Sequence, residues 1–159
     1  MNILSAVNVT DSFTAANLTL ISDAKARTKR FAICSGDGKP LWYGRFFDCE
    51  FNGEQSSSEM AVAKKAVWLA SKIKGMIGAD VIRLTLKVDA QWLTWANEVA
   101  NGGKRGGKAR ALGEYALEKN VILNVVHIRG TANPADQYTV AGGLKNWQDN
   151  DWNTIVNQT

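Results

Sequence analysis

The order of its apolar segments constrains the fold of this chain more than any other feature. Five short apolar runs have the length and residue types of strands, and they span residues 18–23, 31–34, 41–47, 82–88 and 121–126. Residues 35–40 contain two glycines, an Asp and a Pro, which favour a tight turn between the second and third runs. Three strands in hairpin order, followed by strands that alternate with helices, predict an α/β fold with a five-stranded mixed sheet flanked by helices.

The predicted helices lie between and after the later strands. The longest covers about residues 58–74, with a serine at 56–58 as its cap and with Gly75 and Gly78 at its end. Its buried face is predicted from apolar residues at helical spacing, namely Met60, Ala63, Val67, Ala70 and Ile73. Three shorter helices are predicted: residues 90–100, residues 110–119 and a final helix with Pro134 in its first turn.

Length and composition indicate one globular domain. A chain of 159 residues with 45% hydrophobic residues can build a single core, and we expect it to be a monomer. It has neither an apolar run long enough to cross a bilayer nor the basic start and apolar stretch of a signal peptide, so we expect no membrane partner and no secretion. Cys34 and Cys49 are predicted to lie apart as free thiols, which suits a reducing, cytoplasmic compartment. The net charge of +4 permits a polyanionic partner without requiring one.

Four acidic residues stand at the boundaries of the predicted elements. Asp23 and Asp89 each close an apolar run, whereas Glu59 opens the long helix and Asp136 lies near the start of the last one. Such positions can converge at one edge of a sheet. Because clustered carboxylates repel one another, they persist together only if a hard cation holds them. The four acids therefore predict a metal site.

The four acids, in this order, resemble the active-site motifs of the ribonuclease H family. The family's motifs are similar to Ser22-Asp23-Ala24 at a strand end, to Glu59 at a helix head, to Val88-Asp89-Ala90-Gln91, and to the segment from His127 to Asp136. The form Asn133-Pro134-Ala135-Asp136 is closest to the motif of retroelement members. The similarity covers about residues 18–143, which leaves 1–16 as a lead-in and 144–159 as a C-terminal extension.

This resemblance implies a ribonuclease H-like fold and a metal-dependent endonuclease that hydrolyses the RNA strand of RNA–DNA hybrids. It implies two Mg²⁺ ions, for which Mn²⁺ can substitute, with Asp23 bridging both. Asp136 would complete the site of the ion that activates water, and Glu59 and Asp89 would hold the ion beside the leaving oxygen. His127 would assist proton transfer or product release.

The resemblance also implies where the hybrid binds. Gln91 corresponds to a family residue that contacts bases in the minor groove. A basic, glycine-rich segment at residues 102–110 takes the place of the family's larger basic handle, or is a connector with solvated charges. The residues predicted to contact phosphates are Lys104, Arg105, Lys108 and Arg110.

Other interpretations of the same residues stay open. Each acid alone could be a turn residue or could favour a helix start, and His127, the only histidine, could be structural. The family's first Asp is usually followed by Gly-Ser, whereas Ala24 and Lys25 stand here, which puts the local contacts to RNA in doubt. Alternative functions are another nuclease on the same fold, such as a resolvase or an exonuclease, and a non-catalytic nucleic-acid-binding module. Proofreading exonucleases usually carry Asp-x-Glu in the first strand, and the present Asp23-Ala24-Lys25 lacks that Glu.

Overall fold

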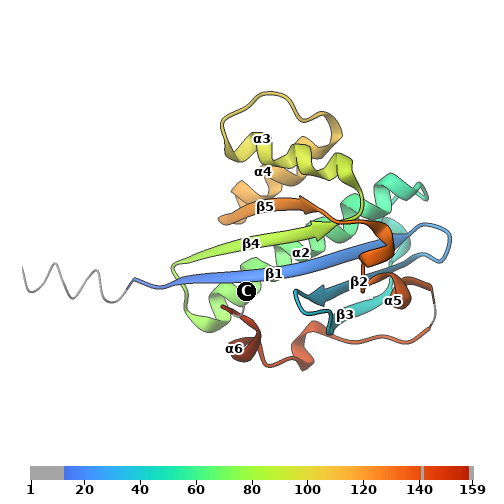
Figure 1. Cartoon of the computed structure of the whole chain (residues 1–159), viewed down its shortest axis with the longest axis horizontal. Coiled ribbons are helices and arrows are strands. Elements are labelled where there is room, and N and C mark those ends of the chain that lie inside the picture. Colours follow the sequence, from blue (N-terminus) through green and yellow to red (C-terminus); the bar gives the residue numbers. More distant parts are fainter. Residues whose placement is uncertain (1–12, 141, 158–159) are drawn as a thin grey trace, which may run out of the picture.

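A computed structural model describes residues 13–140 and 142–157. Five strands form one sheet in the order β3-β2-β1-β4-β5 (Figure 1). They are β1 (Ala15–Lys25), β2 (Arg30–Ser35), β3 (Pro40–Arg45), β4 (Val81–Val88) and β5 (Val121–His127). The pairs β1–β2 and β2–β3 are antiparallel, whereas β1–β4 and β4–β5 are parallel. This strand order and mixed pairing confirm the predicted fold class, a ribonuclease H-like fold.

The central strand β1 is longer than the apolar run that predicted it. It continues through Asp23, opposite Ala32, to Lys25, opposite Arg30, because β2 pairs with it along this whole stretch. Asp23 therefore lies inside the strand rather than at its end. Since side chains alternate between the two faces of a strand, Lys25 projects on the same face as Asp23.

Helices cover both faces of the sheet. The long helix α2 (Gln55–Ile77) packs against one face and lies behind the sheet in the view of Figure 1. The other α-helices are α3 (Asn97–Ala100), α4 (Arg110–Glu118), α5 (Asp136–Val140) and α6 (Trp152–Ile155). Short 3-10 helices occupy Asp48–Glu50, Gln91–Ala96, Gly107–Ala109, Gly130–Ala132 and Trp147–Asp149. The segment predicted as one helix at 90–100 is thus a 3-10 turn followed by one α-turn.

The ends of α2 differ from the prediction. The helix begins at Gln55, and no side chain caps its start. The predicted serine cap is therefore wrong, because Ser56, Ser57 and Ser58 all lie inside the helix. The Ser58 hydroxyl donates to the backbone oxygen of Gln55 at 2.7 Å. At the other end the helix continues through Gly75 and stops at Gly78, which has a left-handed φ of 69°. A left-handed residue after the last turn suits glycine because it has no Cβ to clash.

The last helix also starts later than predicted. Pro134 lies in a turn before α5, not in its first turn, and Asp136 is the first helical residue. The Asn133 side-chain oxygen accepts a hydrogen bond from the backbone N–H of Ala135 at 2.9 Å, which favours a turn over helix at this point.

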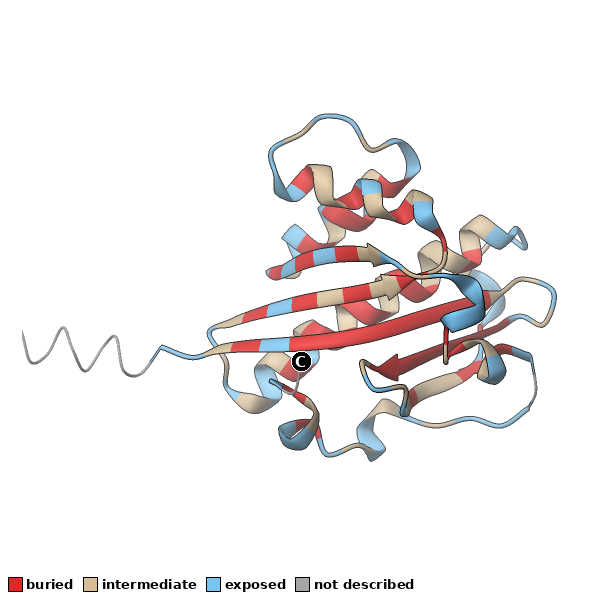
Figure 2. Cartoon of the chain, in the orientation of Figure 1, coloured by how far each residue is buried: buried red, intermediate tan, exposed pale blue. Residues whose placement is uncertain are grey.

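The main core lies between the sheet and α2. Leu18 and Leu20 of β1 pack there against buried residues of α2, and Figure 2 shows β1 buried along most of its length. The predicted helix face is confirmed except for Met60, which is only half-buried. A smaller cluster on the opposite face joins Ile21 and Ala32 to Ala135 beside α5. The two faces thus have separate apolar clusters, as a sheet covered on both sides requires.

The C-terminal segment packs on this main core. Trp152 is 3% exposed and belongs to the main cluster. The Asn157 backbone N–H donates to the backbone oxygen of Asn17 at 2.7 Å, which ties the end of the described chain to β1. Both cysteines are free, with Cys34 buried and Cys49 exposed. Among the residues that the structure describes, no helix has the length and hydropathy needed to cross a membrane.

Candidate active site

Three of the four predicted acids line one small hollow at the carboxyl ends of β1 and β4. The parallel register pairs Ile21 of β1 with Lys87 of β4. Asp23 and Asp89 each follow two residues later, so they lie alongside each other. Glu59 reaches the same hollow from the second turn of α2. The rest of the lining includes the apolar Val62 and Leu93. Carboxylates from three separate elements therefore meet over a largely apolar floor.

Gln55 fixes the start of α2 against the end of β1. Its side-chain amide donates to the Ala24 oxygen at 2.7 Å, and its side-chain oxygen accepts from the Ala26 N–H at 2.9 Å. This double contact places Glu59, one turn further along α2, beside the strand. The Trp92 indole N–H donates to the Glu59 carboxylate at 3.3 Å and orients it. Gln55 carries no recognisable signal in the sequence, because its partners are backbone groups that any residue supplies.

The fourth acid, Asp136, lies at the start of α5 on the face of the sheet toward which Asp23 points. The Asn133 amide donates to the Ser22 oxygen at 3.2 Å and holds this loop against β1. The Thr139 hydroxyl lies 3.2 Å from Asp23 Oδ2 and 2.6 Å from the Asp136 backbone oxygen, so α5 also contacts the first acid. Asp136 therefore lies near Asp23 but outside the hollow that Asp23, Glu59 and Asp89 line.

Lys25 lies between Asp23 and Asp136. Its ammonium forms a hydrogen-bonded ion pair with Asp136 Oδ1 and lies 3.6 Å from Asp23 Oδ2. Partial burial lowers the pKa of Lys25, but its hydrogen bond to Asp136 and the charges of both acids outweigh this, so the pKa is raised overall. Lys25 is thus a charged partner of the cluster, although in the sequence it is only a departure from the family motif.

The electrostatics of the cluster show an excess of negative charge. Burial, and then repulsion by Asp89, raise the pKa of Asp23 from 3.8 to about 7; Asp136 adds to this, while Lys25 and Thr139 oppose it. Burial also raises the pKa of Glu59, with a further contribution from Asp89, against the hydrogen bond from Trp92. The single ammonium of Lys25 therefore does not neutralise the cluster, and another cation would be stabilised here.

The donor set suits a hard divalent cation in chemistry and charge. Carboxylate oxygens are the protein ligands that Mg²⁺ prefers, and Asp23, Glu59 and Asp89 share one hollow. Within residues 13–140 and 142–157, however, no three side chains of His, Cys, Asp or Glu are already closed into a metal-holding group. The acids line the hollow, and side-chain movement is needed before three of them share one ion.

The structure places His127 at the end of β5, opposite Val88 and exposed to solvent. The hydrogen bonds found in the described part of the chain do not connect it to the acids. The loop that follows passes close to Asp89, because a Cβ added to Gly130 would lie 3.5 Å from Asp89 Oδ2. Gln91 is exposed at the start of the 3-10 turn after Asp89. His127 and Gln91 both lie at the carboxyl edge of the sheet, where the acids are.

The basic segment at 102–110 contains two kinds of positive residue. Arg110 donates to the backbone oxygen of Gly103 at 2.9 Å and forms an ion pair with Glu114 at 2.8 Å, so its guanidinium holds the loop together. Lys104, Arg105 and Lys108 are exposed. Only these three thus present free-standing positive charge at the surface of this segment.

A hollow of about 330 Å³ lies between this basic segment and the 3-10 turn that carries Trp92. Its lining comprises Ser56, Trp92, Trp95, Gly106 and Lys108. Trp92 donates to Glu59, and Trp95 is 46% exposed. The hollow therefore extends from Trp92, which contacts Glu59, to the exposed Lys108 of the loop, over an aromatic surface.

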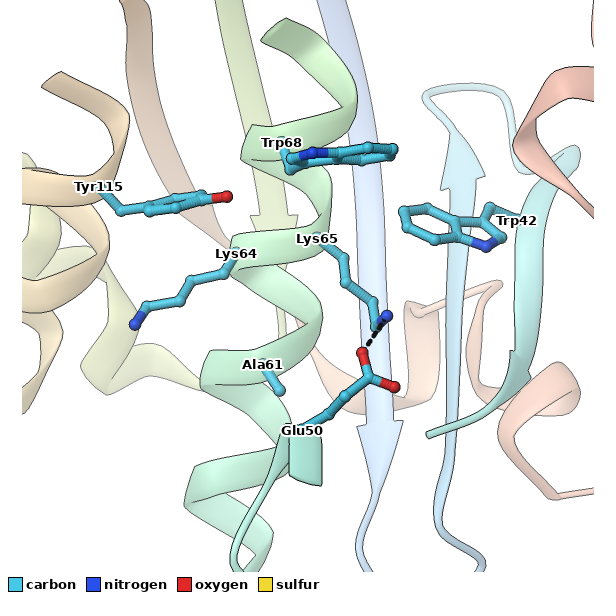
Figure 3. A pocket seen from close by; sticks show the side chains of 7 residues that line it. All are labelled: Trp42, Glu50, Ala61, Lys64, Lys65, Trp68 and Tyr115. Carbon is cyan, nitrogen blue, oxygen red and sulfur yellow. Dashed lines mark ion pairs between the residues drawn. The ribbon is translucent and has the colours of Figure 1, made fainter. Parts of the chain in front are cut away.

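A separate hollow of about 410 Å³ lies on the outer side of α2 (Figure 3). Trp42, Trp68 and Tyr115 line it together with Lys64, Lys65, Glu50 and Ala61, and none of the four acids does. Lys65 is paired with Glu50 and lies 4.6 Å from the centroid of the Phe31 ring. Its ammonium also lies 5.0 Å from the centroid of the Trp42 ring, so Lys65 is part of the packing of α2 against β2 and β3.

The chain has a distant structural likeness to a solved protein. No protein-family model matches the chain, and no curated protein matches it. It is similar to a solved structure described as RNase H1 from the halophilic archaeon Halobacterium salinarum NRC-1, with 14% sequence identity over 78% of this chain and 93% of that one, at a TM-score of 0.42. So distant a likeness says nothing of activity. The chain has a ribonuclease H-like fold by its own strand order and pairing.

Proposed function

We propose that this protein is a metal-dependent endonuclease that hydrolyses the RNA strand of RNA–DNA hybrids. The observation that carries the proposal is the convergence of Asp23, Glu59 and Asp89, from three separate elements, on one hollow. Burial and mutual repulsion make these carboxylates costly to keep together. A role in holding a cation and a polyanionic substrate accounts for that cost.

The acids would hold Mg²⁺ or Mn²⁺, in the two-ion arrangement expected from the sequence. Glu59 and Asp89 would lie on one side of Asp23, and Asp136 on the other. When bound, the cations supply positive charge that acidifies the attacking water and stabilises the departing oxyanion. The second side is available only when Lys25 leaves its ion pair with Asp136.

The remaining side chains orient the acids and handle protons. The Trp92 N–H directs the Glu59 carboxylate, and the Thr139 hydroxyl contacts Asp23 Oδ2. His127 would assist proton transfer or product release, and its exposure lets it exchange protons with solvent without opening the core.

The hybrid would extend from the acids across the hollow beside Trp92 and Trp95 to the basic segment. Lys104, Arg105 and Lys108 would contact phosphates without reading sequence. Trp92 and Trp95 offer aromatic surface beside them, and Gln91 would reach the minor groove. Selectivity for a hybrid would come from 2′-hydroxyls on one strand and the DNA backbone on the other.

One assay tests the proposal directly. End-labelled RNA–DNA hybrid, duplex DNA, duplex RNA and a four-way junction are each incubated with the protein, in Mg²⁺ and in EDTA. We expect internal cuts in the RNA strand of the hybrid in Mg²⁺ only. Symmetric cleavage of the junction would favour a resolvase, and hybrid binding with no cleavage of any substrate would favour a non-catalytic module.

A further inference from the structure

Lys25 is placed among the acids by the geometry of β1. It follows Asp23 by two residues in the same strand, so both side chains project from the same face of the sheet. Its ammonium pairs with Asp136 Oδ1 and lies 3.6 Å from Asp23 Oδ2. A cation shared by these two carboxylates would need the same space.

We propose that Lys25 occupies the second cation position in the substrate-free protein, so that the acid cluster binds one divalent ion there instead of two. This inference rests on the metal site of the proposed function. The one ion binds on the side formed by Asp23, Glu59 and Asp89, and Lys25 neutralises the side formed by Asp23 and Asp136.

The charges of the cluster favour this division. In the described part of the chain, the ion pairs that these four acids make all involve Lys25. Glu59 and Asp89 thus have no basic partner there, and their side retains the larger excess of negative charge. On the other side, a divalent ion next to an ammonium would meet strong repulsion at short range. The first ion therefore enters beside Glu59 and Asp89, and Lys25 opposes a second.

The backbone at Lys25 is held on two sides. Lys25 pairs with Arg30 across the antiparallel ladder, and the next residue, Ala26, donates its N–H to the Gln55 side chain at 2.9 Å. A cation can therefore enter between Asp23 and Asp136 only if the Lys25 side chain rotates away, because the strand itself is held in place. The Lys25 side chain is 24% exposed, so it has room to rotate toward solvent.

Manganese titration of the substrate-free full chain tests the inference. Free Mn²⁺ is followed by electron paramagnetic resonance, which gives the number of ions bound. We expect about one ion in the wild type and about two in Lys25→Met, with spin coupling between neighbouring ions in the variant alone, since the two ions of such sites lie about 4 Å apart. Lys25→Arg should bind as the wild type does, because it keeps the positive charge.

Lys72→Met is the matched control, since it removes one exposed lysine from the other end of α2. It should bind the same number of ions as the wild type, which separates a local effect of Lys25 from a change in net charge. Circular dichroism verifies folding, and Lys25→Gln replaces Lys25→Met if the latter does not fold.

Two coupled ions in the wild type, no ion in the wild type, or no second ion in the folded Lys25 variant would each overturn the inference. Its failure is distinguishable from failure of the proposed function. Hybrid cleavage by a wild type that binds two ions refutes the role of Lys25 alone. One bound ion that becomes two in Lys25→Met, without cleavage of any substrate, refutes the nuclease and leaves the role of Lys25 intact.

Discussion

Replacing Asp23 with Asn should stabilise the metal-free protein at neutral and higher pH. Asp23 is 5% exposed, and its pKa is raised from 3.8 to about 7 by burial and then by Asp89. Between these two pH values the native state holds a proton that the unfolded chain has released. Stability contributed by Asp23 is therefore full below pH 3.8, falls as the pH rises to about 7, and is level above that.

The size of the effect follows from the same values. The change in pKa from 3.8 to about 7 corresponds to a destabilisation of about 4 kcal/mol at high pH. Asn forfeits the attraction of Lys25 and adds an N–H group that must find a partner, which offsets part of this gain. We expect Asp23→Asn to be more stable than the wild type by about 1–3 kcal/mol at pH 8 in EDTA, and by much less at pH 4.

Urea unfolding in EDTA, at several pH values between 4 and 8, measures this difference. Subtracting wild type from variant removes the contributions of groups that titrate in both proteins. Asp149→Asn, which removes an exposed carboxylate from the C-terminal segment, is the control and should show no comparable pH-dependent difference. A difference between Asp23→Asn and wild type that stays constant with pH, or a variant less stable at pH 8, would refute the reasoning. Added Mg²⁺ should stabilise the wild type more than the variant.

Three further predictions concern catalysis. Asp89→Asn should abolish hybrid cleavage because it removes a negative charge that the cation needs. It should leave the stability of the metal-free protein unchanged or raised, because that charge also repels the other acids; cleavage at the wild-type rate would remove Asp89 from the site. His127→Ala should slow turnover about tenfold to a hundredfold in steady-state assays, and total loss in a folded variant would make this residue a ligand or the principal base. Replacing Lys104, Arg105 and Lys108 with Ser should raise KM strongly, leave kcat within a few-fold and lower the log–log salt slope by about one unit per lost phosphate contact; an unchanged KM and slope would make the segment a connector.

The sequence by itself determined the hairpin order of the first three strands in a mixed sheet, and it singled out the four acids. Apolar runs and turn chemistry are local signals, and the short spacing of the first three runs requires hairpins. The confirmed sheet follows from these signals, with β3, β2 and β1 side by side. The acids were identifiable because each stands at the boundary of a predicted element, and such boundaries meet at one edge of a mixed sheet.

Element ends were less predictable because their determinants are distant. Gln55 starts α2 by bonding backbone groups of Ala24 and Ala26, about thirty residues earlier in the chain. Sequence spacing pointed instead to the nearby serines. Arg110 is counted as a phosphate contact by composition, yet its guanidinium bonds Gly103 and Glu114. Composition records a charge, whereas only packing shows where that charge is satisfied.

Only the tertiary structure placed Lys25 between two of the acids. In the sequence it is an unexpected residue after Asp23, and its main partner, Asp136, lies 111 positions away. The pair forms because β1 turns Asp23 and Lys25 to the same face, and α5 brings Asp136 over that face. Carboxylates and an ammonium interact strongly over a few ångströms and weakly beyond, so their distances decide what the cluster binds, and those distances exist only after the chain has folded.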